Sequence, residues 1–142
     1  MNRAGRATGG CLCGAVRYEV RGPLRDVVLC HCNECRRWTG HVLAATAARS
    51  DDLIVVRADG LRWFDSPASD RGARRGFCAL CGSSLFWEPR GAGTTSIAAG
   101  SLDQPTGLRV AGHWYSHHVG DYYEIADDLP RDDRSTTALP DS

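Results

Sequence analysis

Apolar and polar residues alternate along several short stretches of this chain, which is the pattern of strands with one buried face. Between Val16 and Arg21, for example, every second residue is apolar and the residues between are charged. Turn signals rich in Gly, Pro and Asp separate such stretches. Further strands are expected at Val27–Cys30, Val42–Ala47, Leu53–Ala58, Leu61–Asp65, Arg74–Phe77, Ser84–Trp87, Thr95–Ala99 and Tyr122–Ile125.

No window of a dozen residues keeps a helical period. One short helix is expected at Asn33–Thr39, ended by Gly40 as its C-terminal cap. Short strands at regular intervals predict a mainly β fold, either a sandwich or a set of folded-over hairpins. A chain of 142 residues is the size of one domain. Residues 126–142 are rich in Asp, Pro, Ser and Thr, which predicts a largely mobile tail.

Charge and hydropathy exclude some classes of protein. Seventeen basic residues, all of them Arg, balance seventeen acidic ones, and this argues against a dedicated nucleic-acid binder. Only the local group Arg71, Arg74 and Arg75 keeps that possibility open. No apolar stretch is long enough to span a bilayer, and the first ten residues lack the apolar core of a signal peptide, so we expect a cytoplasmic protein without a membrane partner.

Seven cysteines are the unusual feature of the composition. Their odd number and the expected reducing compartment make a disulfide framework less suitable than metal binding. They occur in three groups: Cys11-x-Cys13, Cys30-x-Cys32-x-x-Cys35 and Cys78-x-x-Cys81.

Two of these groups together offer four thiols. A glycine follows each pair, at Gly14 and Gly82, and permits the tight backbone turn that lets two neighbouring thiolates face one ion. Four thiolates in tetrahedral geometry suit zinc. We therefore expect one structural zinc bound by Cys11, Cys13, Cys78 and Cys81.

The remaining group, Cys30, Cys32 and Cys35, offers three thiols. Three protein ligands and an open fourth position are typical of a catalytic zinc, which can accept an incoming thiol and help remove its proton. His31 could be a fourth ligand but is expected to point away from the metal of its neighbours. A redox pair at Cys32-x-x-Cys35 lacks the βαβ context of thioredoxin-like motifs.

The order of several motifs resembles one family, the glutathione-dependent formaldehyde-activating enzymes, which is shared with centromere protein V. The motifs are Gly10-Cys11-Leu12-Cys13-Gly14, Cys30-His31-Cys32-x-x-Cys35-Arg36, Phe77-Cys78-x-x-Cys81-Gly82, Gly100-Ser101-Leu102-Asp103, His113-Trp114-Tyr115 and Asp127-Asp128-Leu129-Pro130. The resemblance implies an Mss4-like fold of β-sheets stapled by zinc over residues 10–130. Residues 1–9 would be a flexible N-terminus and residues 131–142 a mobile C-terminal tail. It also implies two zinc ions per chain, one structural and one catalytic, at the two sets of cysteines given above.

The activity that this resemblance implies is that of a carbon–sulfur lyase, similar to S-(hydroxymethyl)glutathione synthase. Zinc at Cys30, Cys32 and Cys35 would bind the thiol of glutathione or a related co-substrate, which adds to or leaves a small aldehyde such as formaldehyde. Arg36 and Arg37 could grip a carboxylate of the thiol, and Trp38 could line the mouth of the site.

The polar residues around the sites have plainer interpretations as well. The four histidines at positions 41, 113, 117 and 118 are candidate proton shuttles or a fourth zinc ligand. Asp103 is expected to organise its own turn, and Asp127 and Asp128 to be solvated. The alternative function is a zinc-structured binding module without catalysis, in which a histidine such as His41 completes the second site. The sequence leaves the oligomeric state open.

Overall fold

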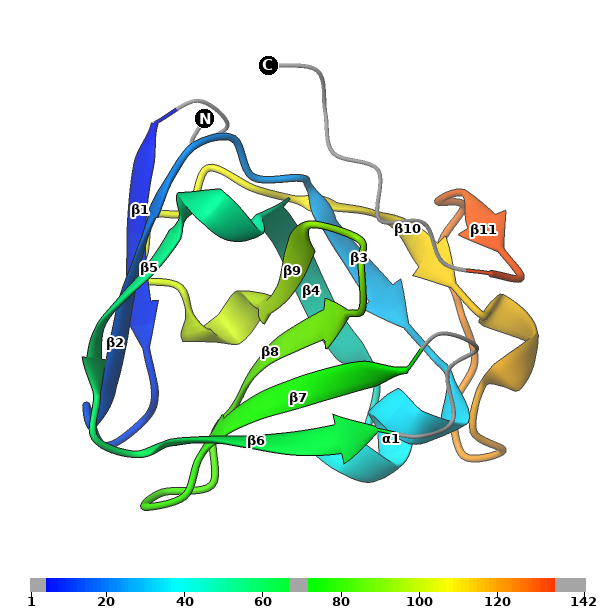
Figure 1. The fold of residues 1–142 in the computed structure, drawn as a ribbon. Coiled ribbons are helices and arrows are strands. Elements are labelled where there is room, and N and C mark those ends of the chain that lie inside the picture. The colour runs from blue at the N-terminus through cyan, green and yellow to red at the C-terminus, as the bar shows by residue number, and fades with distance from the viewer. Residues whose placement is uncertain (1–4, 67–71, 135–142) are drawn as a thin grey trace.

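The structure, a computed structural model, describes residues 5–66 and 72–134. Within these residues the chain forms two β-sheets, one short α-helix and three single-turn 3₁₀ helices (Figure 1). The strands are β1 (Arg6–Gly10), β2 (Val16–Arg21), β3 (Val27–Cys30), β4 (Leu43–Arg49), β5 (Leu53–Ala58), β6 (Leu61–Ser66), β7 (Ala73–Cys78), β8 (Ser84–Pro89), β9 (Thr94–Ala98), β10 (Val110–Trp114) and β11 (Arg131–Asp132). The helices are α1 (Asn33–Thr39), η1 (Ser50–Asp52), η2 (Ala99–Ser101) and η3 (Ser116–His118). The predicted mainly β class is confirmed.

The two sheets differ in size and composition. The smaller has the strand order β1-β2-β5 and is antiparallel, and the larger has the order β11-β10-β3-β4-β9-β8-β7-β6. Among the described strands, β10 alone has parallel neighbours on both sides, β3 on one side and β11 on the other. Because β10 runs beside β3, the end of a C-terminal strand lies next to the cysteine segment that follows β3.

The core lies between the two sheets. Val16, Tyr18 and Val20 on β2, the apolar set that predicted this strand, are at most 1% exposed. They belong to the same cluster as Phe86 on β8 and Ile97 on β9 of the larger sheet. The alternating apolar residues of β2 therefore all lie on one buried face of the strand, as a period of two residues requires.

Most of the strands expected from the pattern are present, but β1, β10 and β11 were not expected and one expected strand is absent. Arg6–Gly10 forms β1 and pairs with β2 along its whole length, so the first strand begins before Gly10. The chain around Tyr122–Ile125 forms a turn and irregular backbone rather than a strand. There Tyr122 and Tyr123 place their rings against His41 and His31, and these contacts fix the segment without sheet pairing.

The helix α1 has the predicted bounds and termini. Cys32 is its N-cap, and Gly40 ends it in the left-handed region, at φ 88°. Seven residues are far fewer than a bilayer requires, and no helix in the described part of the chain is long and apolar enough to cross a membrane.

Candidate metal centres

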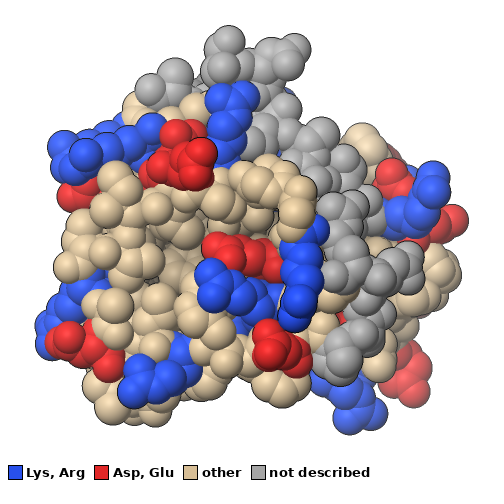
Figure 2. Space-filling view, viewed as in Figure 1, with Lys and Arg blue, Asp and Glu red and all other residues tan. Residues whose placement is uncertain are grey.

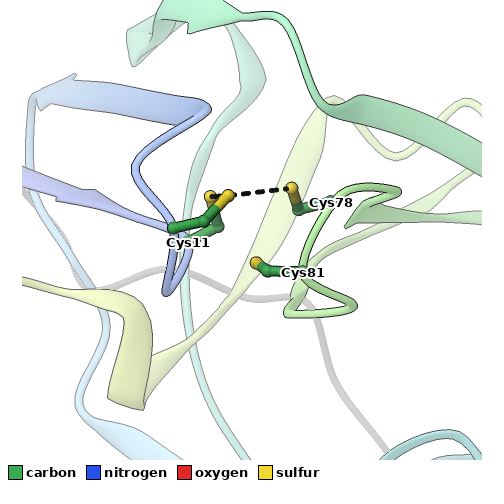
Figure 3. Close-up of side chains that lie close together, drawn as sticks. Cys11, Cys78 and Cys81 are labelled. Carbon is green, nitrogen blue, oxygen red and sulfur yellow. Dashed lines mark hydrogen bonds between the residues drawn. The ribbon is translucent and has the colours of Figure 1, made fainter.

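Four cysteines from two distant turns meet at one edge of the core. Cys11 and Cys13 follow β1, while Cys78 ends β7 and Cys81 follows it. Their four sulfur atoms all lie within 4.8 Å of one another. Figure 3 shows the side chains of Cys11, Cys78 and Cys81 pointing toward one another from opposite sides of the site.

The spacing of these sulfurs fits a tetrahedral zinc ion. The Sγ atoms of Cys11 and Cys13 are 3.7 Å apart, and those of Cys13 and Cys78 are 3.8 Å apart. A zinc–sulfur bond of about 2.3 Å in tetrahedral geometry requires sulfurs about 3.8 Å apart. The donor set and its edge lengths therefore suit one closed zinc site.

The local backbone explains how each pair reaches this geometry. Gly14 and Gly82, directly after each pair, have φ angles of 83° and 82°, which side-chain-bearing residues rarely adopt. The turns also aim hydrogen bonds at the sulfurs: the Val16 amide donates to the Cys11 Sγ at 3.2 Å. Hydrogen bonds from Ser83 lower the pKa of Cys81 to about 5. Such donors stabilise the thiolate form that a metal requires.

The second cluster contains three cysteines from one short segment. Cys30 ends β3, Cys32 caps α1 and Cys35 lies in its first turn, and their sulfurs lie within 4.8 Å of one another. Cys30 and Cys35 are buried and Cys32 is half-buried. The Cys35 amide donates to the Cys32 Sγ at 3.3 Å, so the helix start itself orients one of the thiols.

This cluster has three sulfur donors and one remaining position. Among the described residues, no histidine, aspartate or glutamate joins the three thiols as a fourth donor. Hydrogen bonds from Cys30 and Cys35 lower the pKa of Cys32 to about 2, and the Cys32 thiolate in turn raises the pKa of Cys30. Ionisation of one thiol therefore opposes ionisation of its neighbours, and a divalent cation would favour the thiolate form of all three. The donor set fits a zinc ion with an open position.

A buried guanidinium, that of Arg75, lies beside the second cluster. It is 4% exposed, and its Nη2 lies 4.0 Å from the Cys35 Sγ and 3.4 Å from the Glu34 carboxylate. Its Nε donates to the Ser66 hydroxyl at 3.5 Å. The guanidinium also lies 5.8 Å from the ring centroid of Trp38, and both residues line one small pocket.

This position corrects the view of Arg75 as part of a surface cluster. Arg74 forms an ion pair with Glu88 at 2.8 Å, and Arg71 lies outside the described residues. Adjacent strand residues face opposite sides, so Arg74 and Arg75 could not share one surface, and the strand pattern already contained that signal. On the face drawn in Figure 2, acidic and basic side chains lie next to one another.

The residues that follow the second cluster have different environments. Arg36 donates to the Asn33 Oδ1 at 2.6 Å, and its Nε is buried with no hydrogen-bond partner in residues 5–66 and 72–134. Arg37 is exposed. Trp38 packs with Phe64 and Phe77, with ring centroids 5.7 Å apart in both cases. Trp38 is thus fixed between aromatic rings, with Arg75 as its polar neighbour.

The histidines lie outside both clusters of the described chain. His31 turns its ring away from its neighbouring cysteines, toward Tyr123 and His113, as expected. His41 contacts the Tyr122 hydroxyl at 2.7 Å. His117 pairs with Asp133 and contacts His118 edge to face.

Two aspartates have partners that the sequence did not indicate. Asp127 accepts a hydrogen bond from His113 at 2.9 Å and is therefore more than a solvated residue. Asp103, expected to organise its own turn, instead accepts from the Thr8 hydroxyl at 2.6 Å and from Arg17 at 2.5 Å. These partners lie outside the motif of each aspartate, so the local sequence could not indicate them.

Comparison with known proteins places this arrangement in a family. Residues 6–118 match the family described as glutathione-dependent formaldehyde-activating enzyme. The crystal structure of a Rhodobacter sphaeroides protein is similar, with 32% sequence identity and a TM-score of 0.56. That match covers 72% of this chain and 97% of the Rhodobacter chain. The chain belongs to the family of glutathione-dependent formaldehyde-activating enzymes.

Proposed function

We propose that this protein is a zinc-dependent carbon–sulfur lyase that joins glutathione, or a related thiol, to formaldehyde or another small aldehyde, and releases it in reverse. Cys30, Cys32 and Cys35 would hold the reactive zinc, and the four-cysteine cluster a structural one. The observation that supports this most is the convergence of three thiols with no fourth protein donor in the described chain, in a member of this family.

The reaction needs a thiolate held beside a carbonyl carbon. Zinc bound to the three thiols would lower the pKa of an incoming thiol. The thiolate sulfur forms a bond to the aldehyde carbon as the carbonyl π pair moves to oxygen, and the proton lost by the thiol returns to that oxygen. The product is a hemithioacetal, which for formaldehyde is the S-hydroxymethyl adduct of the thiol. The reverse steps return thiol and aldehyde.

The surrounding residues suit these tasks. Arg75 brings a buried positive charge to within 4.0 Å of the Cys35 sulfur, and this favours negative charge on sulfur and on a developing alkoxide nearby. The exposed guanidinium of Arg37 is available for a thiol's carboxylates, whereas the Nε of Arg36 is buried and would be reached only by a rearranged side chain. Trp38, fixed by two phenylalanine rings, lines the pocket that Arg75 also reaches. Seven free cysteines suit a reducing compartment such as the cytoplasm.

Zinc content is the first test of this proposal. Protein purified gently under reducing conditions should contain two zinc ions per chain, and Cys32→Ser should contain one. One zinc in the wild type, unchanged by Cys32→Ser and by added zinc, would overturn the proposal. Cys13→Ser is the matched control, because it should lose the other zinc.

Thiol binding and turnover form the second test. In cobalt-substituted protein, glutathione should change the thiolate-to-metal absorption of the wild type and leave Cys32→Ser unchanged. Exchange NMR should show faster interconversion of glutathione and its hydroxymethyl adduct with the wild type than without protein. A spectrum indifferent to thiols would instead support a binding module with two structural metals.

A further inference from the structure

Four side chains form a continuous hydrogen-bonded chain behind the second cluster. The Tyr123 hydroxyl lies 2.6 Å from the His31 Nδ1, and the His31 Nε2 lies 2.9 Å from the His113 Nδ1. The His113 Nε2 lies 2.9 Å and 3.1 Å from the two carboxylate oxygens of Asp127. His31 is 2% exposed and His113 3%.

The chemistry of the end residue sets the direction of the whole chain. A carboxylate only accepts, so Asp127 requires a proton on the His113 Nε2. With neutral rings, the His113 Nδ1 then accepts from the His31 Nε2, and the His31 Nδ1 accepts from the Tyr123 hydroxyl. Each bond therefore defines the tautomer of the next ring, and chains of this kind strengthen one another.

His31 connects this chain to the cysteines covalently. It stands between Cys30 and Cys32, and its amide donates to the Trp114 carbonyl at 3.1 Å. Its ring is held at both nitrogens, so the backbone on either side has little freedom to rotate. The backbone that carries the two flanking cysteines is consequently held in place beside the cluster.

Two members of the hydrogen-bonded chain follow residue 118, where the match to the family model ends, although Asp127 begins one of the motifs that resemble the family. Residues 6–118 match the family, whereas Tyr123 and Asp127 follow that range. The segment is anchored on its own: Asp127 accepts from the Leu129 amide at 3.0 Å, and Arg131 donates to the Ile125 and Asp127 carbonyls. β11 then pairs with β10 beside His113.

We propose that Tyr123, His113 and Asp127 are positioning residues for the three-cysteine centre, acting through His31, and that residues 119–134 thereby form part of its support. This inference rests on the proposed function, because it assigns these residues to the metal held by Cys30, Cys32 and Cys35. It predicts that changes at Tyr123 and Asp127 weaken retention of that metal and leave the four-cysteine site intact.

The test measures zinc release from the full-length, zinc-loaded protein to a chromophoric chelator. Cys32→Ser identifies the phase that belongs to the second site. Tyr123→Phe and Asp127→Asn should each accelerate that phase by about fivefold, the factor that a typical hydrogen bond contributes. The other phase should not change. A merely structural role would lower the melting temperature and accelerate both phases together.

Neighbouring residues give matched controls. Tyr122→Phe removes an adjacent hydroxyl that contacts His41, and Asp128→Asn removes an adjacent exposed carboxylate. Neither should change either phase. If Tyr123→Phe and Asp127→Asn behave like these controls in a protein that holds two zinc ions, the inference is overturned while the proposed function stands.

A second readout is independent of the metal. Nitrogen-15 NMR should find the Nε2–H tautomer at both His31 and His113. An Nδ1–H tautomer at either ring, or a doubly protonated His113, would overturn the inference. If the second site holds no zinc, the metal count overturns the proposed function. The histidine tautomers alone then decide whether the hydrogen-bonded chain from Tyr123 to Asp127 exists.

Discussion

The two cysteine clusters of this protein use the same ligand type in opposite ways. The four-cysteine cluster joins turns 65 residues apart, at Cys13 and Cys78, whereas Cys30 to Cys35 span a single turn and the start of a helix. A cross-link between distant residues restricts the unfolded chain far more than one within a short segment. The first cluster also offers a full set of four donors, and the second offers three beside a buried guanidinium. The four-cysteine cluster is suited to stabilising the fold because it joins distant parts of the chain. The three-cysteine cluster is suited to catalysis because one coordination position of its metal would remain open.

The strongest test of this division of roles is to remove one ligand from each cluster and compare the losses. Cys78 is fully buried and belongs to the core cluster, so Cys78→Ser should remove the first metal and destabilise the protein by more than about 4 kcal/mol. Cys32→Ser should remove the second metal at a cost of about 1 kcal/mol. Zinc content and urea denaturation measure both. Equal losses of stability would contradict the division of roles.

Gly60 gives a second test at the four-cysteine cluster without removing a ligand. A Cβ there would lie 2.5 Å from the Cys78 Sγ and 3.3 Å from the Ala15 Cβ. Gly60→Ala should therefore displace that sulfur, costing about 1–3 kcal/mol and lowering zinc retention at the first site only. Gly100→Ala is the control, because its Cβ would meet no atom of the described residues within 4 Å. If Gly60→Ala changed neither stability nor zinc retention, the site would tolerate a displaced sulfur.

Arg75 gives the corresponding test at the three-cysteine cluster. Its guanidinium lies 4.0 Å from the Cys35 Sγ and its positive charge favours the thiolate form, so Arg75→Met should weaken metal binding at the second site by about tenfold. The first site should keep its affinity. Arg74→Met, which removes the adjacent side chain on the opposite face of β7, should leave both metal affinities unchanged. Competition with a chelator measures the two affinities. An equal effect of both variants would show that Arg75 has no specific role in metal binding at the second site.

The sequence predicted most of the strands and the cysteine turns because these depend on local patterns, whereas the grouping of Cys11 and Cys13 with Cys78 and Cys81 came from counting the donors that a closed site needs. Alternation at Val16–Arg21 gave β2, and the glycines after Cys13 and Cys81 marked the two turns. β1 escaped notice because Arg6–Gly10 contains three small residues and no large apolar side chain. The aromatic content of Tyr122–Ile125 resembled a strand, yet its tyrosines contact histidines from other parts of the chain. Those pairings depend on the sheet that brings β10 beside β3.

The smallest expected effect comes from an ordinary ion pair in the four-cysteine half, and it separates the metal's contribution from that of the surrounding contacts. Asp103 fastens the strand that leads to Cys11, but its side chain and that of Arg17 are 47% and 39% exposed. Solvent screening therefore limits their coupling in an Asp103→Asn, Arg17→Gln double-mutant cycle to about 0.5 kcal/mol. Arg17 lowers the pKa of Asp103, so this stabilisation is fully present above the ordinary carboxyl pKa of about 4 and is lost only as the pH falls through the lowered value. The coupling should thus be the same at pH 7 and pH 5, whereas stability that depends on bound metal falls over the same range as thiols protonate. A coupling that falls together with the metal would mean that the ion pair depends on the four-cysteine site rather than standing beside it.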